Sequence, residues 1–147
     1  MTRANIQRST GETVETTMTI ERKRKTRGMV EAEFTRSLIQ FEKEHLGRGP
    51  ADVRTYLLPD MAVVRMQGIL TPAEQKLSAT AEGRDLVKEM RRQLFENSRD
   101  LLEAIVDDVL GCRLVSLHTD MSTVSGERMV VFIVDADLDV LYPAGRR

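Results

Sequence analysis

The sequence predicts a two-layer α+β domain, with a four-stranded, mainly antiparallel sheet and helices on one face. Three observations lead to this class. An amphipathic helical pattern at residues 28–46 precedes two short segments of alternating apolar residues, a long interrupted helical pattern occupies residues 72–110, and a second alternating pair lies between Cys112 and Asp135. The expected order is α–β–β–α(broken)–β–β, and hairpins that alternate with helices favour segregated layers.

Composition indicates one soluble domain. A chain of 147 residues is long enough to bury a core, and with no Trp and 4% aromatic residues that core should be aliphatic. The single cysteine, Cys112, excludes an intramolecular disulfide and suits a reducing cytoplasm. No run approaches the roughly 18 apolar residues that a transmembrane segment needs, and the start lacks the apolar core of a signal peptide. We expect a cytoplasmic protein with no transmembrane segment.

Charge divides the chain unevenly. Residues 1–27 hold seven Lys and Arg against three Glu, whereas the remainder holds fifteen against twenty acids. We expect a flexible basic N-terminal tail at 1–27, a single domain at 28–137 and a frayed tail at 138–147. The basic run at 21–27 offers charge attraction to nucleic acid or anionic lipid, or it simply solubilises the chain.

The first half should form a helix and a hairpin. Val30, Phe34, Leu38 and Phe41 recur at helical spacing, and Gly47 suits a left-handed helix end. Alternating segments at 52–58 and 61–68 then read as strands joined by a turn around Pro59.

The second half should form a broken helix and a closing hairpin. Thr71, Pro72 and Glu74 make a capping box, so we interpret Thr71 and Glu74 as a helix start rather than a catalytic pair. A break at 78–83 precedes an apolar stripe formed by Val87, Met90, Leu94, Leu101, Ile105 and Val109. This segment spans about 40 Å and a seven-residue strand about 23 Å. Either the helix at 28–46 or a second subunit covers the excess, and we expect a homodimer. The last strand is apolar on both faces and should lie inside the sheet.

Two surfaces are candidates for ligand or partner binding. The first is the predicted loop from His118 to Arg128, whose candidate residues are His118, Thr119, Asp120, Ser122, Thr123, Glu127 and Arg128. It has the hydroxyls and charges to bind a small anion or polar ligand, or these side chains only stabilise a turn. The second comprises Arg48, Arg54, Tyr56 and Arg65, which suit a phosphate, carboxylate or bicarbonate, or which pair with acids of the same domain.

Other chemistry has little support in the sequence. His45, His118 and Cys112 are not at metal-ligand spacing, and neither HExxH nor CxxC occurs, so we expect no metal. The chain has no glycine-rich phosphate loop and no nucleophile motif, and we expect no cofactor and no enzymatic activity.

Several separated segments resemble one family. They are Phe41-Glu42-Lys43-Glu44 with Gly47-Arg48-Gly49-Pro50, then Leu70-Thr71-Pro72-Ala73-Glu74, Glu82-Gly83-Arg84, and Ser116-Leu117-His118-Thr119-Asp120 with Ser122-Thr123 and Gly126-Glu127-Arg128. These are similar to the bacterial MpsC-like family, labelled as a component of a sodium-translocating, membrane-potential-generating system, over about Gly28 to Asp137. The resemblance implies an accessory or regulatory protein that acts with a membrane transporter component of a cation or bicarbonate uptake system. The alternatives are a nucleic-acid-binding module and a small-ligand-sensing module.

Overall fold

The computed structural model describes residues 25–145, so most of the predicted basic tail lies outside the described part of the chain. The elements are α2 (Arg27–His45), β1 (Asp52–Leu58), β2 (Met61–Gln67), α3 (Pro72–Leu77), α4 (Ala81–Asn97), α5 (Arg99–Ile105), the π-helical turn η1 (Val106–Leu110), β3 (Leu114–Ser122), β4 (Glu127–Val134) and α6 (Leu138–Leu141). The predicted order α–β–β–α(broken)–β–β is confirmed, with α6 as an addition.

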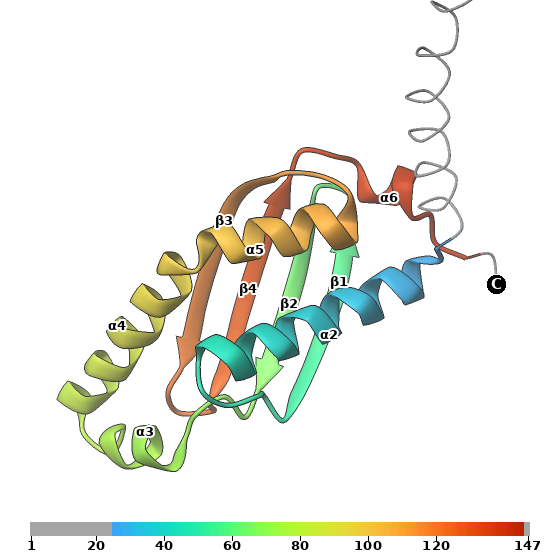
Figure 1. Ribbon diagram of the computed structural model, residues 1–147. Coiled ribbons are helices and arrows are strands. Elements are labelled where there is room, and N and C mark those ends of the chain that lie inside the picture. The colour runs from blue at the N-terminus through green and yellow to red at the C-terminus, as the bar shows by residue number, and fades with distance from the viewer. Residues whose placement is uncertain (1–24, 146–147) are drawn as a thin grey trace, which may run out of the picture.

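All four strands form one antiparallel sheet in the order β1-β2-β4-β3. Strand β4 is therefore an inner strand, as its apolar residues on both faces predicted. Helices α2 and α5 lie across one face of this sheet, and α4 extends past its β3 edge (Figure 1). The described residues place no helix over the opposite face. This uncovered surface is called the open sheet face below.

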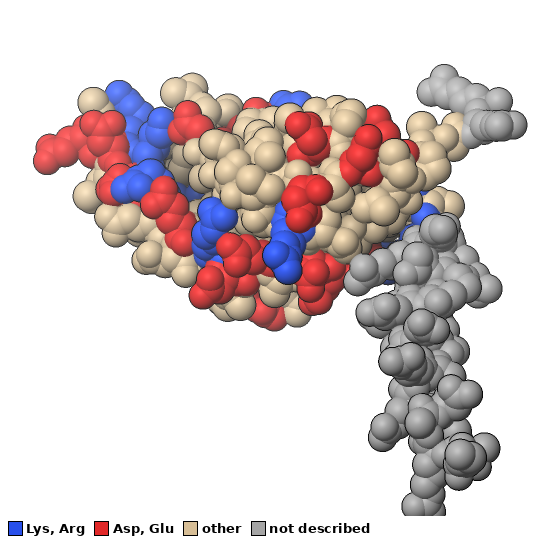
Figure 2. All heavy atoms as spheres, turned by 90° about the horizontal axis from the view of Figure 1, so that it is seen from above, with Lys and Arg blue, Asp and Glu red and all other residues tan. Residues whose placement is uncertain are grey.

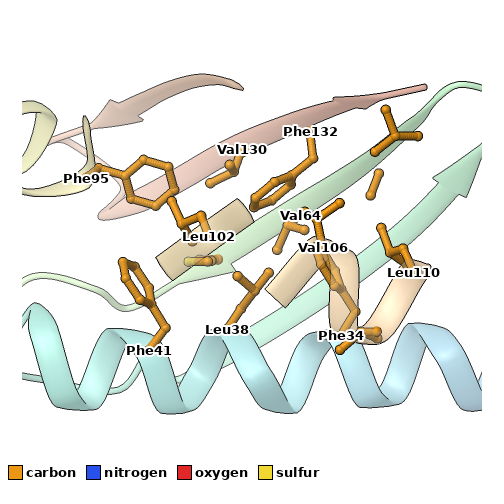
Figure 3. Packing of buried hydrophobic residues seen from close by; sticks show 14 of the residues in the cluster. Phe34, Leu38, Phe41, Val64, Phe95, Leu102, Val106, Leu110, Val130 and Phe132 are labelled. Atoms are coloured by element: carbon orange, nitrogen blue, oxygen red, sulfur yellow. The ribbon is translucent and has the colours of Figure 1, made fainter. Parts of the chain in front are cut away.

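The core lies between α2, α5 and the sheet. Phe34, Leu38 and Phe41 point from α2 toward the sheet, and Phe132 of β4 meets Phe34 edge to face at 5.2 Å between ring centroids (Figure 3). Phe95 of α4 meets Phe41 in the same way at 6.0 Å. All four phenylalanines are buried in this core. The core was expected to be aliphatic, and aliphatic side chains do surround these four rings.

Local capping signals set the helix ends. The Thr71 hydroxyl accepts a hydrogen bond from the Glu74 N–H at 3.2 Å, and the Glu74 carboxylate accepts one from the Thr71 N–H at 3.0 Å, which confirms the capping box. Thr80 caps α4 through the Gly83 N–H. Gly47 follows α2 with φ of +92°, a conformation that costs glycine little.

The helical pattern breaks near residues 78–80 as predicted, but the segment that follows is itself interrupted, which was not expected. It breaks at Ser98, whose hydroxyl donates to the Leu94 carbonyl at 2.8 Å, and α5 begins at the next residue. Its buried line also differs from the predicted stripe, because Met90, Leu94 and Leu101 are exposed. The residues that face the core in these two helices are Gly83, Val87, Arg91, Phe95 and Leu102. An arginine takes a core position because buried carboxylates pair with it.

The C-terminal segment is part of the domain rather than frayed. Leu138 and Tyr142 are 0% and 2% exposed, and the Tyr142 hydroxyl donates to the Leu110 carbonyl at 2.9 Å. Arg27 donates to Asp139 and to the Tyr142 carbonyl, and also bonds the Leu57 carbonyl. Residues 25–27, which were assigned to the tail, thus belong to the folded unit, because Thr26 caps α2 and Arg27 joins its start to α6.

Candidate functional site

Four charged residues from four elements meet inside the domain, and we call them the Glu–Arg cluster: Glu42 of α2, Glu74 of α3, Arg91 of α4 and Arg128 of β4. Arg91 holds Glu74 with two hydrogen bonds, Nε to Oε2 at 2.7 Å and Nη2 to Oε1 at 2.6 Å. The same Nη2 donates to the Ile69 carbonyl at 2.9 Å. This two-point pairing is the strongest geometry available to an arginine and a carboxylate.

The other half of the cluster is more loosely paired. Glu42 is 0% exposed, and its oxygens lie 3.7 Å from Arg91 Nη1 and 3.6 Å from Arg128 Nη1, beyond hydrogen-bond distance. Neither Glu42 oxygen accepts a hydrogen bond, and Arg128 Nε and Nη1 donate none. Arg128 also stacks over the Phe95 ring at 4.8 Å. Because a buried polar group without a partner costs about 1–3 kcal/mol, this half of the Glu–Arg cluster is the less stable half.

The electrostatics of the two carboxylates differ. Burial raises the pKa of Glu42 above its ordinary 4.5, although Arg128 and Arg91 act against this. Burial also acts to raise the pKa of Glu74, but hydrogen bonds from Arg91 and Thr71 outweigh it, so that pKa lies below its ordinary value. Burial lowers the pKa of Arg128. Glu42 is thus the carboxylate that the fold stabilises least in its charged form.

A surface pocket of about 280 Å³ opens beside Arg128, and we call it the Arg128 pocket. Helix α4 and strands β3 and β4 line it with Asp85, Lys88, Glu89, Arg92, Thr119, Asp120, Met121 and Arg128. Lys88 pairs with Asp120 at 3.3 Å, and Arg92, which also lines the pocket, pairs with Glu89 and Glu96. The pocket therefore combines charged residues of α4 and β3 with Arg128, which is 2% exposed.

Three of the residues predicted for the first candidate surface line this pocket: Thr119, Asp120 and Arg128. The predicted loop from His118 to Arg128 is itself much shorter than expected. Strand β3 continues to Ser122 and β4 begins at Glu127, so only residues 123–126 connect them. Polar residues of an edge strand were mistaken for a loop. Thr123 is a turn residue beside Ser122, whose hydroxyl accepts from the Ser125 N–H.

The remaining predicted residues gather on the open sheet face, with one exception. Arg54, Tyr56 and Arg65 lie there with His118, Ser122 and Glu127, as the pairing register requires. Arg65 pairs with Glu127 at 2.7 Å and Arg54 with Asp52 at 3.6 Å, so the predicted alternative of pairing with acids holds for both. His118 contacts the Ser116 hydroxyl at 3.1 Å. Arg48 lies apart and donates to the Leu70 carbonyl at 3.4 Å.

Glu42 and Arg91, which complete the Glu–Arg cluster, were not predicted as site residues from the sequence. A signal for both was present. Glu42 follows Leu38 by four residues, and Arg91 lies midway between Val87 and Phe95 at the same spacing, so each charge occupies an apolar line of its helix. Charged residues are rarely buried unless a residue of opposite charge pairs with them. A glutamate and an arginine at buried positions of two helices therefore predict such a pair.

Metal and membrane features are absent from residues 25–145. No group of three or more His, Cys, Asp and Glu side chains is arranged to hold an ion there. None of the helices in that range is long and apolar enough to cross a bilayer.

The fold and site together define a class of small α+β domain, with a buried Glu–Arg cluster beneath a charged pocket and a sheet left open on its other face. The chain belongs to the MpsC family, whose model, described as "Na+-translocating membrane potential-generating system (MpsC)", matches residues 26–136. The match begins at the residue that caps α2 and ends just before α6. The family resemblance noted from the sequence is confirmed.

Two relatives from Bacillus subtilis (strain 168) cover most of the domain. One, named "Uncharacterized protein YbcI", is 40% identical over 116 residues, which is 79% of this chain and 94% of the relative. The other, named "Uncharacterized protein YrhF", is 30% identical over 109 residues, 73% of this chain and 88% of the relative. No solved structure gives a significant match.

Proposed function

We propose that the protein is a non-enzymatic accessory or regulatory component of a membrane-potential-generating cation transport system, and that it responds to a small carboxylate-like anion in the Arg128 pocket. Membership of the MpsC family supports the link to such a system. The observation that supports a ligand is Arg128, a buried arginine that lines a surface pocket and whose ion-pair partner, Glu42, lies 3.6 Å away, beyond hydrogen-bond distance.

An anion with two coplanar oxygens suits this arrangement. Carboxylate and bicarbonate present acceptors in the spacing of a guanidinium fork, and a phosphate does so with higher charge. The pocket walls carry Lys88 and Arg92 with three acids, so their charges nearly cancel. A singly charged anion such as bicarbonate therefore fits better than a multiply charged one.

The test is a titration of the full chain with sodium bicarbonate, acetate and phosphate, at constant ionic strength and against chloride. We expect saturable stabilisation by bicarbonate or acetate, seen as a rise in melting temperature, since a ligand that binds only the folded state raises its stability. Arg128→Lys should abolish the shift. Lys88→Gln changes an exposed residue of the pocket, cannot be confused with a folding defect, and should weaken the apparent affinity severalfold. Lys76→Gln removes the charge of an exposed lysine on α3, away from the pocket, and is the matched control.

The cellular role is read from membrane potential. In cells that lack the protein, a potential-sensitive dye should report a smaller sodium-dependent potential, which the wild-type chain restores and Lys88→Gln restores less well. A potential that does not change on deletion would contradict the accessory role. Stabilisation by bicarbonate no greater than by chloride would contradict the anion site.

A nucleic-acid role, suggested by the basic run at 21–27, is not supported by the face of the molecule that Figure 2 shows. Figure 2 shows acidic and basic side chains interspersed over the face seen from above, whereas polyanion binding relies on a patch of one sign.

A further inference from the structure

The open sheet face is more apolar than a solvent-facing surface requires. Antiparallel sheets with one covered face usually carry polar residues on the other. Here seven apolar side chains spread over β1, β2 and β4: Tyr56, Leu58, Met61, Val63, Met129, Val131 and Ile133. Tyr56, Leu58 and Met129 are 48%, 42% and 38% exposed, and the other four are partly buried. A contiguous patch of this kind marks an interaction surface.

We propose that this face packs against the same face of a second copy, in a two-fold symmetric dimer whose axis runs parallel to the strands. This inference goes beyond the proposed function and uses the side of the sheet opposite to the core. Face-to-face sheets pack about 10 Å apart with their strands nearly aligned. An isologous dimer of this kind requires a self-complementary surface, which the register allows us to examine.

The pairing register places side chains of the open sheet face in rows across the sheet. One row reads Tyr56, Val63, Val131, His118, and the next reads Arg54, Arg65, Met129, Asp120. An axis parallel to the strands brings β1 of one copy over β3 of the other and keeps each row over itself. Arg54 then faces the second copy's Asp120, Val63 faces Val131, and Tyr56 faces His118. At the edges Arg54 thus meets an opposite charge. In the middle, Val63 meets Val131, and Arg65 meets Met129 while it keeps Glu127 of its own copy at 2.7 Å.

The other face-to-face symmetry is less complementary. An axis perpendicular to the strands lays β1 over β1 and β3 over β3 with their directions reversed. Asp120 then faces β3 of the second copy, which has no Lys or Arg between residues 114 and 122. Because burying a charge without a partner costs several kcal/mol, the charge pattern favours the parallel axis.

A second apolar surface competes for the role of dimer interface. Leu86, Met90, Leu94 and Leu101 are exposed on α4 and α5, where the stripe predicted from the sequence had suggested a dimer. Arg92 is already paired there with Glu89 and Glu96, and nothing in the fold indicates what would cover this face. It serves as the comparison surface in the test.

The test is a charge exchange read by light scattering and sedimentation across a concentration series. We expect the wild-type chain to be a dimer. Arg54→Asp and Asp120→Arg should each weaken dimerisation at least tenfold, because each sets like charges against one another across the interface. The double variant, R54D with D120R, should restore it.

Restored dimerisation in the double variant can arise only from contact between the two copies. Within one copy β1 and β3 are separated by two strands, about 14 Å, so Arg54 and Asp120 are not neighbours. Leu94→Glu, on the comparison surface, should leave the dimer intact, and circular dichroism should show every variant folded. A monomeric wild-type chain, a double variant without rescue, or dissociation by Leu94→Glu in place of the sheet variants would overturn the proposal.

Discussion

Arg91 is the residue that joins the helices of this domain to one another. It is 1% exposed, and its guanidinium bonds Glu74 of α3 and the Ile69 carbonyl and lies 3.7 Å from Glu42 of α2. A buried ion pair seldom adds net stability over an apolar pair of the same shape, but removal of one member leaves an uncompensated charge. The Glu–Arg cluster therefore fixes which helix faces meet. Within it, Glu42 is the carboxylate whose charged form burial disfavours most.

Glu42 should give stability a distinctive pH dependence. Because burial raises its pKa above 4.5, the folded protein retains a proton at pH values where the unfolded chain has lost it. Unfolding then releases a proton, so the Glu42 contribution to stability falls as pH rises through and above 4.5. We expect the unfolding free energy of wild type minus that of Glu42→Gln to decrease over this interval, with a slope of at most about 1.4 kcal/mol per pH unit.

The measurement is urea unfolding at a series of pH values from 4 to 8. Glu44→Gln, which removes an exposed carboxylate from the same helix, is the matched control. Parallel profiles for wild type and Glu42→Gln would show that burial does not govern Glu42. The opposite slope would mean that the two arginines dominate and hold Glu42 charged.

At the scale of elements, the α3–α4 corner depends on a close approach that only glycine permits. A Cβ on Gly83 would lie 1.7 Å from the Leu77 carbonyl oxygen and 2.7 Å from its carbon, so the backbone of one helix must move. We expect Gly83→Ala to lower the unfolding free energy by about 1–3 kcal/mol, the usual cost of overpacking. Chemical denaturation measures it.

Gly28 supplies the matched control for that substitution. It also lies in the first turn of a helix, α2, and a Cβ there would meet nothing within 4 Å. Gly28→Ala should therefore stabilise the protein by about 0.4–1 kcal/mol through the unfolded chain. Equal effects of the two substitutions would refute the steric argument.

The elements divide into those that local sequence determines and those that tertiary contacts determine. Thr71, Thr80 and Gly47 are local signals, and the helix ends they mark were predicted within a residue or two. The break at Ser98 has no breaker residue, and the buried line through Arg91 depends on carboxylates brought from α2 and α3. Part of the pocket was predicted through Thr119, Asp120 and Arg128, but its buried half required knowledge of which helices meet.

For the whole molecule, the two faces of the sheet differ in what covers them. The covered face holds the core and the Glu–Arg cluster, with the Arg128 pocket at its β3 edge, whereas the open sheet face is available for a partner. Asp120 lies on the edge strand between them, where it pairs with Lys88. The anion proposal and the dimer proposal therefore share one residue, Asp120.

The C-terminal segment, with α6, packs against the rest of the domain, and we expect the fold to depend on it. Leu138 and Tyr142 are almost fully buried, and Arg27 ties the start of α2 to Asp139 at 2.8 Å. Large buried side chains each contribute about 2–5 kcal/mol, a sizeable share of the 5–15 kcal/mol typical of a domain. Removal of residues 138–147 should therefore lower the urea midpoint sharply or prevent folding.

A shorter truncation separates closure from mere chain length. Removal of residues 144–147 leaves Leu138, Asp139 and Tyr142 in place and should leave the unfolding free energy within about 0.5 kcal/mol of the full chain. Tyr142→Phe keeps the ring but loses the 2.9 Å hydrogen bond to the Leu110 carbonyl, and should cost about 1 kcal/mol. If the longer truncation were as stable as the shorter one, α6 would be an appendage, and the family match ending at residue 136 would mark the true end of the folded unit.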